Sequence, residues 1–250
     1  MFLDLSALDI AVILATYMFA ATAKGVTGLG FSTTCLPILA FVIGLKDALS
    51  LVIIPSVCSN LVVMRQVGRF GETIQRFWPM LLTLLPGLAL GLWILSWIDG
   101  IQAGAILGGI LLFWCVFSLA KPDLRLPIGW ERALAPISGF ITGTVNGVTG
   151  SQVIPVVPFL MTLHLDRNLF IQAINCSFTL SSLVMAIGLG QLGLFSREDF
   201  VISALGTGFV FIGLRIGSAI RHRLSENFFR SAVLAVLFVM GLSLIAPALY

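Results

Sequence analysis

Two short glycine-rich motifs hold the residues of this chain that are best suited to binding a small ligand. They are Lys24-Gly25-Val26-Thr27-Gly28 and Asn146-Gly147-Val148-Thr149-Gly150. Glycine allows close approach and a positive φ, and a helix that begins beside such a loop offers backbone N–H groups and partial positive charge to an anion. We therefore predict that the Gly25–Gly28 and Gly147–Gly150 loops together form one anion site, with the N–H groups of the following segments as donors.

Hydroxyl and amide side chains gather around both motifs and on two later segments. Such neutral hydrogen-bonding groups suit a small oxyanion better than an apolar ligand. The same residue types also join packed membrane helices through hydrogen bonds, and for the later segments that structural role remains open. Besides the residues of the two motifs, the predicted substrate-binding set contains Gly30, Ser32, Thr33, Asn60, Ser151, Gln152, Asn175 and Ser177.

Two basic residues are candidates for pairing with a negative charge on the substrate. Lys24 is the only basic residue between the first two apolar segments, and Arg215 belongs to the ninth, where it directly follows the charge-free run 200–214. Each could face an anion, or could extend to lipid headgroups as interfacial Lys and Arg do. We include both in the predicted substrate-binding set and leave their orientation open.

The apolar segments lack the residue combinations that are typical of enzymes and metal sites. All eleven Asp and Glu residues lie at segment ends or in loops, and the four cysteines form no Cys-x-x-Cys pair. Neither a Ser-His-Asp set nor a His-Glu-x-x-His motif occurs. We predict no enzyme activity, no catalytic residue, no cofactor and no metal. A coupling proton could travel on a weakly acidic substrate, and sodium could be held by backbone carbonyls.

The composition of the chain indicates the environment in which these residues lie. Of the 250 residues, 58% are hydrophobic and 10% charged, and the net charge is +3. Soluble domains carry roughly 25% charged residues, so this chain has too little polar surface for water. The small net charge does not indicate a nucleic-acid partner. The composition predicts an all-α integral membrane protein whose partners are the lipid bilayer and a small anionic substrate.

Charge-free runs divide the chain into segments. About 20 apolar residues cross a bilayer as one helix, and the run 133–165 is too long for one crossing. We divide it at the second motif, as the first motif divides the two runs at the start. The result is about ten transmembrane or half-membrane helices, over residues 10–23, 25–45, 48–64, 77–98, 100–120, 133–145, 152–164, 168–196, 200–214 and 231–250.

The two halves of the chain repeat the same features in the same order. Besides the two motifs, Leu36-Pro37 matches Val157-Pro158, and Gly87-x-x-x-Gly91 matches Gly213-x-x-x-Gly217. Each half has five segments, an odd number, so the second half enters the membrane from the opposite face. This predicts an inverted repeat with a first half at 1–120, a cytoplasmic linker at 121–132 and a second half at 133–250. The Gly-x-x-x-Gly pairs allow close helix contact within the monomer or at the seam of a homodimer.

Basic residues predict the orientation. With both termini outside, the cytoplasmic side receives nearly all of the 14 Lys and Arg residues, as the positive-inside rule requires. Only Lys46 and Arg197 then face outward. The others are Lys24, Arg65, Arg69, Arg76, Lys121, Arg125, Arg132, Arg167, Arg215, Arg221, Arg223 and Arg230.

The repeated glycine signature, the Leu-Pro-type element behind it and the two-fold architecture resemble the TauE/SafE family of sulfite and organosulfonate permeases, over residues 8 to 249. The resemblance implies an inner-membrane transporter, often an exporter, for small sulfur-containing anions such as sulfite, thiosulfate or organosulfonates. Two alternatives remain open. One is an anion channel or facilitator of the same fold, and the other is a membrane enzyme or assembly factor.

Overall fold

A computed structural model describes residues 6–120, 125–127, 129–220 and 226–249, with the backbone alone at 226–230. Within these ranges the protein has ten α-helices, one short 3-10 turn and no strand. They are α1 (Ala7–Thr27), α2 (Phe31–Ile43), α3 (Leu45–Val67), α4 (Phe70–Trp97), α5 (Gly100–Ala120), α6 (Glu131–Thr149), α7 (Val156–Thr162), α8 (Arg167–Gln191), α9 (Arg197–Ile220), α10 (Glu226–Ile245) and η1 (Ala246–Ala248). The all-α prediction is confirmed.

Seven of the described helices are long and apolar enough to cross a membrane, namely α1, α3, α4, α5, α8, α9 and α10. The short helix α2 has 13 residues and contains Pro37, and α7 has only 7 residues. The chain is therefore a multi-pass membrane protein in which the short helices α2 and α7 each lie between two longer ones along the sequence. Part of the predicted linker at 121–132 lies outside the described residues, and its boundaries remain a prediction.

The two glycine motifs are not loops, so the predicted segment boundaries at these places are wrong. Helix α1 continues to Thr27 and α6 to Thr149, and each ends on a left-handed glycine, Gly28 with φ 83° and Gly150 with φ 73°. Glycine usually weakens a helix. Here Gly25 and Gly147 remain helical because another helix packs directly on them.

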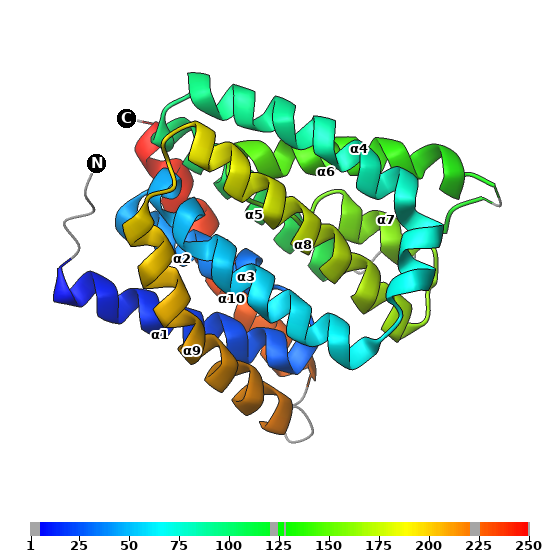
Figure 1. The fold of residues 1–250 in the computed structure, drawn as a ribbon, viewed down its shortest axis with the longest axis horizontal. Coiled ribbons are helices and arrows are strands. Elements are labelled where there is room, and N and C mark those ends of the chain that lie inside the picture. Colours follow the sequence, from blue (N-terminus) through cyan, green and yellow to red (C-terminus); the bar gives the residue numbers. More distant parts are fainter. Residues whose placement is uncertain (1–5, 121–124, 128, 221–225, 250) are drawn as a thin grey trace.

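That packing occurs between helices of different halves. A Cβ atom on Gly25 of α1 would lie 2.9 Å from the Cα of Gly217 on α9, and one on Gly147 of α6 would lie 2.7 Å from the Cα of Gly91 on α4. The Gly-x-x-x-Gly pairs therefore make close contacts inside the monomer. Figure 1 shows α4 and α6 together along one side of the molecule, and α1 and α9 along the other.

The central pair, α3 and α8, lies between these two outer pairs (Figure 1). Thr179 near the middle of α8 donates to the sulfur of Met64 near the end of α3, at 3.5 Å. Further along α8, Met185 lines a small cavity with Leu49 from the beginning of α3. The two helices therefore run antiparallel. Corresponding helices that meet in opposite directions are what an inverted repeat requires.

Candidate functional site

The ends of α1 and α6 have the same local geometry. The N–H groups of Gly28 and Gly150 each donate to the carbonyl four residues earlier at 2.7 Å. Thr27 Oγ1 accepts from the N–H of Leu29 at 3.2 Å, and Thr149 Oγ1 accepts from the N–H of Ser151 at 3.2 Å. Both hydroxyls therefore stabilise the bend after their own helix. The two threonines are therefore equivalent in backbone capping.

The two bends line different cavities. Thr27, Leu29 and Gly30 line a cavity of about 580 Å³. Gly150 and Gln152 line a cavity of about 20 Å³. The predicted single site shared by both motifs is therefore not a common cavity in this conformation.

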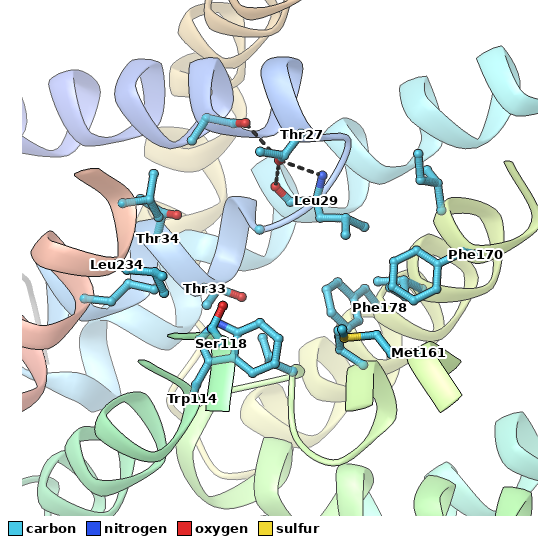
Figure 2. A pocket seen from close by; sticks show the side chains of 18 of the residues that line it. Thr27, Leu29, Thr33, Thr34, Trp114, Ser118, Met161, Phe170, Phe178 and Leu234 are labelled. Atoms are coloured by element: carbon cyan, nitrogen blue, oxygen red, sulfur yellow. Dashed lines mark hydrogen bonds between the residues drawn. The ribbon is translucent and has the colours of Figure 1, made fainter. Parts of the chain in front are cut away.

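The large cavity is bounded by the bend after α1 and by α2, α5, α8 and α10, with Val153, Val157 and Met161 from the α7 region. Figure 2 shows Thr27 and Leu29 on one side and Trp114 on the opposite side, with Phe170, Phe178 and Met161 forming a further wall. Most of the lining is apolar. Its polar lining residues are Thr27, Thr33, Thr34, Ser118 and Arg167.

Arg167 is the cationic lining residue of this cavity and is absent from the predicted set. It is the first residue of α8 and is exposed. Asp166 caps this helix, accepting from the N–H groups of Asn168 and Leu169 at 3.1 Å each. Sequence reasoning treated Arg167 only as a cytoplasmic loop charge. Its position directly after an N-cap aspartate was the available signal, since it places the side chain on the first turn of a helix.

The loop around Asp166 also holds α3 and α4 against α8. Arg69 donates from Nη1 to Asp166 Oδ2 at 2.7 Å. The backbone N–H of Leu169 and the Arg69 guanidinium lower the pKa of Asp166, because each stabilises the carboxylate form. The ionised carboxylate of Asp166 is therefore the form that caps the N-terminus of α8, directly before Arg167.

The small cavity lies in a polar core between α2, α3, α6 and α8. Ser32 and Ser56 share a hydrogen bond of 2.7 Å, and Gln152 Nε2 donates to Ser182 Oγ at 3.1 Å. Among the described residues, Asn146 Nδ2 and Gln152 Oε1 have no hydrogen-bond partner although both are buried. A volume of about 20 Å³ is enough for one water molecule, and these groups could hold it.

Lys24 is buried within the protein, with 1% of its surface exposed. Its Nζ donates to Ser59 Oγ at 3.3 Å and to Asn60 Oδ1 on α3. The headgroup-facing alternative for Lys24 is therefore wrong. Arg215 has the opposite outcome: it is exposed on α9 and lines neither cavity.

The remaining predicted site residues lie in different surroundings. Asn175 Nδ2 donates to the carbonyl of Gly28 at 3.3 Å, so it ties α8 to the bend after α1. Gly30 borders open space, with no atom within 4 Å of a Cβ built there. Ser151 and Ser177 are buried. The structure thus brings Thr27, Gly30 and Thr33 to the large cavity, and Ser32, Asn146, Gly150 and Gln152 to the small one.

Comparison with known proteins identifies the family. No curated protein and no solved structure matches the chain. The model of the family described as sulfite exporter TauE/SafE matches residues 13–244. That family consists of membrane transporters and not of enzymes. With this match over nearly the whole length of a multi-pass helical chain, the protein belongs to the TauE/SafE sulfite exporter family and is an exporter-type membrane transporter.

Proposed function

We propose that this protein exports small sulfur-containing oxyanions across the cell inner membrane, and that the large cavity beside the end of α1 is the substrate site. The observation that carries the proposal is this cavity of about 580 Å³, with one cationic and several hydroxyl groups in its lining. Its size falls within the roughly 300–1,000 Å³ of small-molecule sites. Membership of the TauE/SafE family supplies the chemical class of the substrate.

The lining favours organosulfonates over bare sulfite or thiosulfate. Arg167 and the hydroxyls of Thr33 and Thr34 are suited to the three oxygens of a sulfonate group, because a guanidinium and hydroxyls donate hydrogen bonds to oxyanions. The aromatic wall, with Phe170 and Phe178, is suited to an apolar substituent. A bare inorganic anion would leave that wall uncovered. The second glycine motif makes no substrate contact in this arrangement.

Counterflow in proteoliposomes tests the proposal. Labelled alkylsulfonate, sulfite, thiosulfate and a matched alkylcarboxylate are each offered to vesicles that contain the unlabelled compound. We expect accelerated uptake of the sulfur anions, strongest for the alkylsulfonate, because a carrier exchanges bound substrate. A channel would give no such acceleration. Absence of counterflow with every sulfur anion would reject the proposal.

Arg167→Gln locates the site, and Arg215→Gln is the matched control because Arg215 lies outside the cavity. We expect Arg167→Gln to raise the half-saturating sulfonate concentration by about tenfold, the scale of one hydrogen bond to a charged group. Arg215→Gln should leave it unchanged. If the control loses affinity and Arg167→Gln does not, the substrate binds elsewhere.

We also propose that both termini lie outside the cell. Cysteines placed at Ser196, and at Ser225 beyond the described residues, should react with an impermeant reagent from opposite sides of the membrane. Intact cells and inside-out vesicles provide the two directions. Ser196 should be labelled from outside. Labelling of Ser196 from the cytoplasmic side would contradict the outward termini, and labelling of both positions from the same side would contradict five segments in each half.

A further inference from the structure

Lys24 is a buried ionisable side chain on α1. On the same helix, the neighbouring Ala23 and, three residues later, Thr27 line the large cavity. On α3, its partner Ser59 donates to the carbonyl of Ser56 at 2.8 Å, and Ser56 shares a hydrogen bond with Ser32. Ser32 and Ser56 both line the small cavity. Hydrogen-bonded serines therefore extend from Lys24 to the cavity of about 20 Å³. On its other flank, α1 lines the large cavity.

In the described part of the chain, the side chains bonded to Lys24 carry no counter-charge. Among the described side chains, both of its hydrogen-bond partners are neutral, Ser59 and Asn60. A buried ammonium without an anionic partner is costly. Two events relieve that cost, namely loss of a proton or the arrival of an anion nearby.

No charged side chain on the described parts of the helices packed around α1 is paired with Lys24. Helix α2 has Cys35 as its ionisable side chain, and α10 has none from Ser231 onward. None of the described charged residues on α3 and α9 forms an ion pair or hydrogen bond with Lys24. They are Lys46, Asp47 and Arg65 on α3, and Arg197, Glu198, Asp199 and Arg215 on α9.

Asn60 can serve both charge states of Lys24. Its Oδ1 accepts from the ammonium, while its Nδ2 is buried without a partner in the described structure. A neutral amine has a lone pair and could accept from an amide N–H, after a turn of the Asn60 side chain. A carboxylate at this position would instead hold Lys24 as an ammonium. The pairing with a neutral amide is thus suited to a group that changes charge.

We infer that Lys24 is the proton-carrying group of this transporter. Its ammonium releases one proton to water on one side of the membrane, which leaves a neutral amine, and the amine takes one proton from water on the other side. The ammonium is favoured while an anion occupies the adjacent large cavity and disfavoured once the anion has left. Anion and proton movements are then coupled through the charge on Lys24. This inference rests on the proposed anion transport, and it assigns to a lysine the role that a carboxylate plays in other carriers.

The transport test uses an alkylsulfonate, because its strong acid stays ionised and any pH effect must come from the protein. In wild-type proteoliposomes an imposed pH gradient should change the rate of net sulfonate movement. Lys24→Met and Asn60→Asp should both lose this response. Lys24→Met removes the amine that carries the proton, and Asn60→Asp introduces a carboxylate that keeps Lys24 in its ammonium form. Lys46→Met is the matched control, since Lys46 donates to the backbone carbonyl of Ile98, at 2.9 Å, and lines neither cavity. It should retain the response.

A second measurement is independent of transport. In protein labelled with ¹³C at lysine Cε, Lys24→Met assigns the Lys24 resonance, which should move with pH. In Asn60→Asp it should remain at the ammonium position. If Lys24→Met fails to fold, Lys46→Met and Lys121→Met assign the other two lysines of the chain, and the remaining resonance is that of Lys24.

The outcomes separate the two proposals. Counterflow without any pH-gradient response, or a response that survives in Lys24→Met, overturns the proton-carrying role and leaves anion transport standing. A Lys24 resonance that stays at the ammonium position in wild-type protein at every pH overturns it as well. Absence of counterflow with every sulfur anion rejects the proposed function, and the resonance then decides whether Lys24 exchanges a proton.

Discussion

The ends of α1 and α6 have the same backbone and different surroundings. Both close on a left-handed glycine and a capping threonine. At the end of α1 the motif begins with Lys24 and borders a cavity of about 580 Å³, whereas at the end of α6 it begins with Asn146 and borders one of about 20 Å³. A recurring motif has thus kept its backbone geometry, although one copy borders a substrate-sized cavity and the other a water-sized one.

The largest expected effect tests the shared part of the two motifs, the close packing of Gly25 and Gly147. A Cβ on either would lie 2.6 Å from a backbone oxygen, that of Leu214 or Leu88. We expect Gly25→Leu and Gly147→Leu each to destabilise the protein by about 3 kcal/mol, as severe overpacking does. Thermal unfolding in detergent measures this, with Gly190→Leu, which meets no atom within 4 Å, as the control. Wild-type stability in both variants would show that the helices do not pack as described.

The next effect distinguishes the two cap glycines. Alanine at a positive φ costs roughly 1–2 kcal/mol, and this applies to both Gly28 and Gly150. The added methyl would lie 3.2 Å from Ile171 at Gly28, but 2.6 Å from Leu36 and also against Leu49 at Gly150. We therefore expect Gly150→Ala to lower the unfolding temperature more than Gly28→Ala. The reverse order would mean that the cavity beside Gly150 is looser than the structure indicates.

A smaller effect tests whether the two threonines differ in function. Thr27→Val and Thr149→Val should each cost about 1 kcal/mol of stability, the scale of one intramolecular hydrogen bond. Only Thr27 lines the large cavity, so only Thr27→Val should change sulfonate affinity in the counterflow assay. Equal loss of affinity in both variants would support the shared site predicted from the sequence instead.

The smallest expected effect concerns the exposed pair of Arg69 and Asp166. Among the described residues, no corresponding ion pair is seen at the start of α3. Because the folded state lowers the pKa of Asp166, its stabilising contribution is present above the ordinary carboxyl pKa of about 3.9. It is lost as the pH falls through the lower pKa of the folded state. Asp166→Asn should therefore unfold at a lower temperature than wild type at pH 7, and the difference should shrink in acid. A difference that is constant with pH would exclude a charge effect.

Much of the fold follows from local sequence features. A charge-poor, apolar chain must lie in a membrane, and the recurrence of Gly-Val-Thr-Gly predicts two related halves. The capping roles of Gly28 and Gly150 were accessible too, because glycine commonly ends helices. The error lay in starting the bend at Gly25 and Gly147. Glycine weakens an isolated helix, and only the contact with Gly217 or Gly91 explains why the helix continues.

Tertiary structure decided which of the candidate residues meet. The membrane class and the all-α fold could be predicted from the sequence, since hydropathy and spacing are local properties. The inverted repeat stays a prediction. The sequence did not determine that Lys24 turns inward to Asn60 while Arg215 is exposed, or that Arg167 reaches the large cavity. Those outcomes depend on the direction in which each helix face points. That direction is set by packing between helices far apart in the chain, α1 on α9 and α3 on α8.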